Sequence, residues 1–284
     1  MIENSIKLKA NGGFMKTKMM TLITAALMLV QTSVFAHGGD PNVKLHVNPK
    51  WDQCSFQLDP SLTQKQWHQF TQEATYVIDY RPLTDARPLG AMNFEVSLLR
   101  WNTKVNEEKG AWNNTFVHPD STHWLTNGEP LIIPGLSIRA GLTDKIDVGF
   151  YLTKSIGANY GFWGAQLQYN LLNDLNNNWS ASARINFLSM YGPKDLDFNL
   201  IGLDLLASRK FDLVKWTSVS PYAGVSTFLS NAYEKSKVVD LKDEHTVGLQ
   251  GQIGAVAQIS MARIGVEYSV AKVSSFSIKL GVAF

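Results

Sequence analysis

Apolar and polar residues alternate with a period of two along most of the chain from residue 91 to residue 284. The alternation is clearest at the carboxyl end, in the positions Phe276, Ile278, Leu280, Val282 and Phe284. A period of two places successive side chains on opposite faces of a β-strand. Segments of this kind, separated by polar turns, recur about ten times, with a range of roughly eight to twelve. The pattern predicts an all-β fold.

The two faces of these predicted strands differ in chemistry. One face is almost wholly apolar, and the other carries Ser, Gly, Gln and Asn with single ionisable residues. A soluble barrel turns its apolar face inward, whereas a transmembrane barrel turns that face to lipid and encloses a polar lumen. We therefore predict a transmembrane antiparallel up-and-down β-barrel over residues 91–284. Its ionisable lumen-lining residues are expected to be Glu95, Arg139, Asp147, Arg184, Asp204, Glu267 and Lys279.

The connections between the predicted strands alternate in length, as expected for a membrane barrel. Residues 142–145 form a short connection, whereas residues 231–244 form a long one. With a periplasmic amino terminus and an even number of strands, the short turns lie in the periplasm and the long loops outside. Residues 216–230 also have an extended pattern, but Pro221 and the parity of Tyr222 and Phe228 leave the facing of this segment open.

The first 36 residues have the pattern of an exported leader. Residues 15–36 combine basic residues at the start, an apolar run too short to span a bilayer, and small residues at Val34 and Ala36. These are the three parts of a secretory signal peptide, with cleavage predicted after Ala36. Residues 1–14 are then an upstream extension.

Removing the leader changes the charge of the chain. The full sequence has a formal net charge of +2, and residues 1–36 contain four lysines and one glutamate, so the mature chain carries −1. The basic character therefore belongs to the export signal, and no nucleic-acid partner is expected. The one cysteine excludes a disulfide scaffold or a cysteine-based zinc site.

Residues 37–90 are predicted to be a periplasmic, largely irregular segment that contains one amphipathic helix. Apolar residues recur at three- and four-residue spacing over about residues 61–80, and Asp59 and Pro60 suit a helix start. This helix has three possible positions: on the membrane surface beside the barrel, in the lumen as a plug, or across the periplasmic mouth. Amphipathicity fits all three.

The last predicted strand also carries a resemblance to a known class. Its alternate apolar residues and its terminal Phe284 resemble the carboxy-terminal assembly signal of Gram-negative outer-membrane β-barrel proteins. The resemblance covers residues 91–284 and indicates no narrower family. It implies an outer-membrane location, contact with outer-membrane lipid, and recognition of the last strand by the barrel assembly machinery.

The predicted lumen residues admit two interpretations. Both signs of charge occur among them, and an unpaired charge in a narrow interior is costly, so ion pairs are favoured. They form either a satisfied polar core that stiffens a nearly closed barrel or a selectivity lining for small solutes.

Histidines supply further candidates, for catalysis or metal binding. His118 and His123 could hold a metal ion, although the sequence offers no obvious third ligand. The Asp243-Glu244-His245 segment resembles the acid/base pair of omptins, the outer-membrane proteases. That resemblance implies that Asp243 orients His245, which activates a water. The acidic pair that omptins carry on facing strands has no counterpart here.

The sequence thus favours a non-enzymatic outer-membrane barrel, either a narrow channel for small solutes or a structural or surface-binding protein, with no cofactor expected. The alternative is an outer-membrane hydrolase, a protease or lipid-modifying enzyme, with its site at the rim. The sequence identifies no substrate or surface ligand.

Overall fold

The computed structural model describes residues 58–81, 83–106, 110–113, 131–154, 161–193, 195–236 and 238–284. The predicted extension, signal peptide and cleavage position fall outside these residues. The described elements are α2 (Gln64–Ile78), β1 (Phe94–Thr103), α3 (Gly110–Asn113), β2 (Leu131–Gly141), β3 (Ile146–Lys154), β4 (Gly161–Asp174), β5 (Trp179–Tyr191), β6 (Leu196–Arg209), β7 (Phe211–Val214), β8 (Thr217–Glu234), β9 (Glu244–Ile259), β10 (Ala262–Val270) and β11 (Ser275–Ala283).

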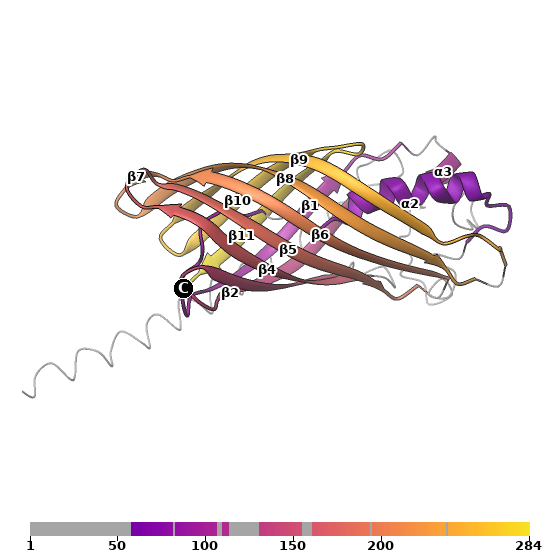
Figure 1. Ribbon diagram of the computed structural model, residues 1–284, viewed down its shortest axis with the longest axis horizontal. Coiled ribbons are helices and arrows are strands. Elements are labelled where there is room, and N and C mark those ends of the chain that lie inside the picture. The colour runs from indigo at the N-terminus through magenta and orange to yellow at the C-terminus, as the bar shows by residue number, and fades with distance from the viewer. Residues whose placement is uncertain are drawn as a thin grey trace, which may run out of the picture. The chain divides into compact units, whose positions relative to one another are not determined.

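The strands form one antiparallel sheet that closes on itself (Figure 1). Strands β1 to β6 and strands β7 to β11 each pair with their neighbours in sequence, β1 pairs with β11, and β6 pairs with β8. The short β7 continues β6 beyond Lys210 and pairs with the start of β8. The wall therefore has ten strands, with β6 and β7 counted as one, which confirms the predicted all-β up-and-down barrel with a preceding helix.

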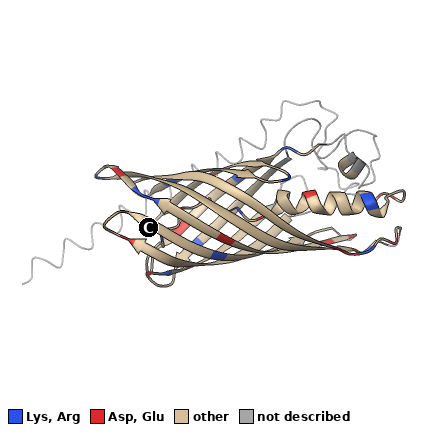
Figure 2. Cartoon of the chain, turned by 45° about the horizontal axis from the view of Figure 1, so that its top comes forward, with Lys and Arg blue, Asp and Glu red and all other residues tan. Residues whose placement is uncertain are grey.

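The two faces of the wall have opposite chemistry. In β6 the exposed positions include Ile201, Leu203 and Leu205, while Asp204 between them is fully buried. Every strand from β1 to β11 carries large apolar side chains that are exposed to the surroundings of the barrel. Figure 2 shows acidic and basic positions on the strands between long uncharged stretches. An outward apolar belt around a polar interior is the arrangement of a transmembrane barrel, as the alternation predicted.

The barrel closes where the first and last strands meet. Phe94 donates its N–H to the Phe284 carbonyl oxygen at 2.7 Å, and Phe284 returns an N–H bond to the Phe94 carbonyl oxygen at 2.9 Å. The two rings stack with centroids 6.2 Å apart. The predicted apolar positions of the last strand, from Phe276 to Phe284, lie on the outer face of β11 or at its end.

The facing of β8, which the sequence left open, follows from two buried aromatic residues. Tyr222 and Phe228 are 4% and 2% exposed, so the even-numbered positions of β8 face the interior. Pro221 lies on the outer face. The inward aromatics obscure the pattern because they are large and partly apolar, yet they fill interior space.

Helix α2 begins three residues later than the sequence suggested. Asp59 was expected to cap it, but its carboxylate instead accepts bonds from Ser61 in a turn before the helix. Thr63 is the N-cap: its hydroxyl accepts from the Gln66 N–H, and the Gln66 side chain accepts from the Thr63 N–H at 3.0 Å. This reciprocal capping box satisfies two backbone donors that Asp59 could not reach. Neither helix among the described residues is long and apolar enough to cross a bilayer.

Candidate functional site: a lumen filled by the chain itself

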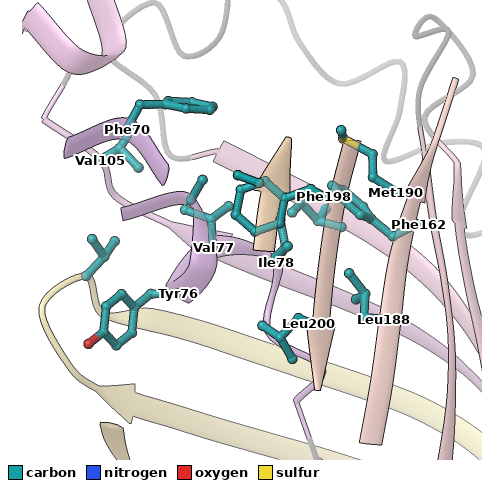
Figure 3. Close-up of a cluster of buried hydrophobic side chains, with 14 of the residues drawn as sticks. Phe70, Tyr76, Val77, Ile78, Val105, Phe162, Leu188, Met190, Phe198 and Leu200 are labelled. Carbon is teal, nitrogen blue, oxygen red and sulfur yellow. The ribbon is translucent and has the colours of Figure 1, made fainter. Parts of the chain in front are cut away.

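One end of the barrel interior is apolar and holds α2. Figure 3 shows Val77 and Ile78 of the helix beside Phe198 of β6, within one cluster of buried side chains. The wall contributes apolar residues from several strands: Trp101, Ile133, Tyr151, Phe162, Leu188, Met190, Phe198, Leu200 and Phe228. Trp101 also donates its indole N–H to the Val77 carbonyl oxygen at 3.0 Å. The helix is therefore held inside the wall by burial and by at least one directed bond.

The change from a polar to an apolar interior is visible in the sequence of the inward positions. In β1 the inward positions Glu95 and Ser97 are followed, with unchanged parity, by Leu99 and Trp101. Inward positions in β5 and β6 change in the same way toward the end that holds α2. A lumen filled with water would stay polar along its length, so the change of chemistry at constant parity signals a packed interior.

A glycine on β9 provides the space for this packing. A Cβ built on Gly248 would lie within van der Waals overlap of the Phe228 ring, which packs edge-on against Tyr76 of α2 with centroids 5.3 Å apart. On the same strand, a Cβ on Gly251 would meet nothing within 4 Å.

Gly248→Ala is expected to displace the Phe228 ring and loosen α2, at a cost of about 1–3 kcal/mol for overpacking. The measurement is the unfolding midpoint in detergent, followed by circular dichroism and by the heat-dependent gel shift of folded barrels. Gly251→Ala is the matched control and should leave the midpoint near that of the wild type. Equal midpoints for all three proteins would contradict the proposed role of Gly248.

After α2 the chain passes through the polar part of the lumen as an irregular segment, here called the plug segment (residues 79–89, of which the structure describes 79–81 and 83–89). Its backbone bonds to the wall at several levels. Arg184 donates to the Tyr80 carbonyl oxygen at 2.6 Å, and the Leu83 N–H reaches the Glu267 carboxylate at 3.2 Å. Ala86 donates to Ser208 Oγ at 3.1 Å and accepts from Asn170 at 3.0 Å. Buried backbone groups need such partners, and here the wall supplies them.

The charged side chains of the plug segment also bond to the wall. Arg81 donates to Gln250 of β9 at 2.7 Å and to Ser275 of β11 at 3.0 Å. Asp85 accepts from Arg263 of β10 at 3.1 Å. The segment thus carries its own charges into the lumen and meets complementary groups there.

Residues 77–89 together reach all ten strands of the wall. The wall residues that bond to them are Trp101 on β1, Arg139 on β2, Asp147 on β3, Asn170 on β4, Arg184 on β5, Ser208 on β6, Ser220 on β8, Gln250 on β9, Arg263 and Glu267 on β10, and Ser275 on β11. A barrel of about ten strands is little wider than those whose interior is filled by side chains. One extended segment with contacts on every side therefore occupies the lumen.

Glu95 of β1 is the centre of the largest charge network. Its carboxylate oxygens lie 2.6 Å from Lys279 Nζ, 2.9 Å from Arg263 Nη1 and 3.6 Å from Arg139 Nη1. Arg139 in turn lies 2.9 Å from Asp147 Oδ2. All five side chains are at most 7% exposed. Such pairs repay desolvation only when their geometry is good, and here Arg139 and Arg263 each have more than one oxygen partner while Lys279 pairs, among the described residues, with Glu95 alone.

A second network surrounds Asp204 of β6. Its carboxylate accepts from Arg184 Nε at 2.6 Å, from the Asn186 amide at 2.9 Å and from the Ser226 hydroxyl. Arg184 also lies over the Tyr80 ring, 5.0 Å from its centroid. The network therefore joins three wall strands to the plug segment.

Apart from Glu73 of α2, a buried carboxylate that accepts from Trp112 of α3, the interior charges of the described residues balance. The cations are Arg81, Arg87, Arg139, Arg184, Arg263 and Lys279, and the anions are Asp79, Asp85, Glu95, Asp147, Asp204 and Glu267. Wall and plug segment are each balanced on their own, with four and two charges of each sign. Glu267 differs from the other wall anions in that its bonds come from neutral donors, the Tyr222 hydroxyl at 2.7 Å and the Leu83 N–H.

The plug segment leaves the lumen at the end opposite α2. The Leu89 N–H bonds to the Asp147 carboxylate at 3.1 Å, and the Ala91 N–H reaches Asp144 in the short β2–β3 turn at 3.3 Å. The chain then turns at Gly90, whose φ of +86° suits glycine. A Cβ on Gly141 would collide with the Gly90 carbonyl oxygen, so this close approach requires glycine at position 141.

The structure places all seven sequence-predicted lumen residues in the interior, each at most 2% exposed. It brings six of them into the two networks, and Glu267 contacts the plug segment. Sequence reasoning missed Arg263, which shares the parity of Glu267 on β10. It also missed the plug segment, because a segment without regular secondary structure has no periodic pattern of apolar residues.

The candidate histidines are not assembled into a site. His245 is exposed on the outer face of β9, and its Nδ1 lies 2.6 Å from Asn231 Oδ1 on β8. Asp243 is exposed in the connection before β9, and the partner that orients His245 is Asn231. This placement gives no support to an acid/base pair. His118 and His123 lie outside the described residues. Within the described residues no group of three His, Cys, Asp or Glu side chains could hold a metal ion.

Comparisons with known proteins match the chain to solved structures only. No protein-family model matches the chain, and no curated protein matches it. Solved structures do match. The attachment invasion locus protein Ail of Yersinia pestis is 12% identical, covers 68% of this chain and 99% of its own, and has a TM-score of 0.28. The β domain of the Bordetella autotransporter BrkA is 13% identical, with coverage of 68% and 100% and a TM-score of 0.38. The KdgM porin is 7% identical, with coverage of 67% and 99% and a TM-score of 0.32. These likenesses are too low to carry an argument about function.

Proposed function

We propose that this chain is a non-enzymatic outer-membrane β-barrel that its own plug segment closes, and that it acts as a structural or surface-binding protein rather than as an open channel. The observation that carries the proposal is the contact of residues 77–89 with every strand of the wall. The balanced charges support it as well, since paired ions serve a packed interior better than a pathway for solutes.

An outer-membrane location and export are part of the same proposal. The outward apolar belt needs lipid, and closure of the antiparallel sheet leaves no open sheet edge in the bilayer. The proposed leader is removed after Ala36, and the last strand, which ends in Phe284, is the segment that the assembly machinery recognises. The intact mass of the purified mature protein tests the first statement, and membrane incorporation of a chain lacking Phe284 tests the second.

Ion conductance in planar lipid bilayers tests the closed lumen. The refolded full-length protein is expected to insert without producing discrete current steps, because the plug segment occupies the path that ions would take. Insertion is verified by the heat-dependent gel shift and by recovery of the protein from the bilayer-forming vesicles. Reproducible current steps from correctly folded wild-type protein would contradict the proposal and restore the channel interpretation.

A further inference from the structure

Helix α2 lies among the long connections of the barrel. Gln64 exchanges bonds with Lys242 in the β8–β9 connection, accepting at 2.8 Å and donating at 3.2 Å, and His68 Nδ1 lies 2.6 Å from Glu244 Oε2. These contacts fix the amino-terminal part of α2 beside the β8–β9 hairpin end.

Two other connections at the same end also contact the helix. Lys272, between β10 and β11, donates to Gln72 at 2.6 Å. Trp112 of α3, between β1 and β2, donates to Glu73 at 2.6 Å. Three separate connections thus hold the helix at one end of the barrel, and Figure 1 shows α2 and α3 at the end away from the carboxyl terminus.

The start of the first strand, β1, and the end of the last strand, β11, lie at the end of the barrel opposite α2. Phe94 and Phe284 meet there, next to the short β2–β3 turn that the chain touches through Ala91 and Asp144. Between Ile78 and Phe94 the polypeptide therefore passes from one end of the lumen to the other.

The lengths of the connections indicate which end faces the cell exterior. At the Phe94 end the turns are short, with residues 142–145, 175–178, 215–216 and 260–261 between consecutive strands. At the α2 end, the β1–β2 and β8–β9 connections span residues 104–130 and 235–243. Outer-membrane barrels have short periplasmic turns and longer extracellular loops, so the end that holds α2 is the extracellular one.

We propose that the chain crosses the outer membrane once through its own lumen. Leu58 to Gln72 are then presented at the cell surface, while the start of β1 and the end of β11 are periplasmic. This places α2 on the side opposite to the periplasmic position expected for residues 37–90 from sequence. The exposed face of the helix, with Thr63, Lys65 and His68, then forms part of the outer surface. The inference rests on the outer-membrane location given above, but not on whether the lumen conducts.

Thiol labelling of intact cells tests the inference. In a Cys54→Ser background, single cysteines replace Lys65 on α2, Asp240 in the β8–β9 connection and Lys145 in a short turn, all of them exposed. A maleimide that cannot cross membranes is expected to label Lys65→Cys and Asp240→Cys as fully in intact cells as after permeabilisation of the outer membrane. Lys145→Cys should be labelled only after permeabilisation.

The other labelling patterns distinguish failure of the threading, of the orientation and of the outer-membrane location. Labelling of Asp240→Cys in intact cells, with Lys65→Cys reached only after permeabilisation, would overturn the threading and leave the proposed function intact. Labelling of Lys145→Cys but not Asp240→Cys in intact cells would overturn the orientation and with it the inference. If the protein is absent from the outer-membrane fraction, the proposed location fails as well. The heat-dependent gel shift of each variant establishes that the barrel is folded.

Discussion

Replacing Glu95 with glutamine is expected to lower the free energy of unfolding by about 3–5 kcal/mol, the range typical for removing one partner of a buried ion pair. Glu95 holds three cations, at 2.6 Å for Lys279, 2.9 Å for Arg263 and 3.6 Å for Arg139. Without its charge the wall and the plug segment together have one excess cation, which the surrounding protein cannot hydrate. The measurement is urea unfolding in detergent, with the heat-dependent gel shift as readout.

A second substitution separates charge balance from packing. Glu95→Gln combined with Lys279→Met removes one charge of each sign, and the double variant should regain most of the lost stability, because replacing both partners of a buried pair is often close to neutral. Asp243→Asn, an exposed acid-to-amide change, is the control and should stay within about 0.5 kcal/mol of the wild type. If Glu95→Gln is as stable as this control, the network does not stabilise the barrel.

Removing the charges of the plug segment is expected to make the barrel conduct ions, which the wild-type protein is expected not to do. The variant carries serine in place of Asp79, Arg81, Asp85 and Arg87. These residues anchor the segment to several strands, and the four wall cations and four wall anions that remain still balance each other. The wall can therefore stay folded around water while the segment loses its attachment. Discrete current steps in planar bilayers are the expected result.

The matched control carries four serines at exposed positions, replacing Lys65, Lys145, Asp240 and Asp243, two charges of each sign as in the test variant. This control should remain silent. A plug-segment variant that folds, as its gel shift would show, and yet conducts no ions would mean that these four side chains do not keep the lumen closed. Equal conductance in the test variant and the control would contradict the assignment in the same way.

The wall of this barrel could be predicted from sequence because the alternation of apolar and polar residues is set within each strand. In β11, residues from Phe276 to Phe284 alternate without interruption, and parity alone sends Ser277 and Lys279 inward. The same parity places Glu95 and Arg184 in the interior. Lipid on one side and a polar interior on the other impose a period of two on each strand independently of every other strand.

The contents of the lumen could not be predicted because their partners are distant in sequence. Arg81 bonds to Gln250 and Ser275, which lie 169 and 194 residues away. An irregular segment offers no period, and its charges look like those of any polar linker. The start of α2 was missed for a related reason: Asp59 and Thr63 are both good caps, and the choice between them depends on Gln66 and on where the helix packs.

The position of the plug segment inside the wall can be tested by cross-linking one residue of each. The Ala86 N–H lies 3.1 Å from Ser208 Oγ of β6, so cysteines at these two positions, in a Cys54→Ser background, should be joined by oxidation or by a short bifunctional thiol reagent. The predicted result is a linked peptide containing both cysteines, found by mass spectrometry in the folded protein and absent from either single variant. Free thiols at both positions in the folded barrel, open to a water-soluble reagent, would contradict a lumen filled by residues 79–89.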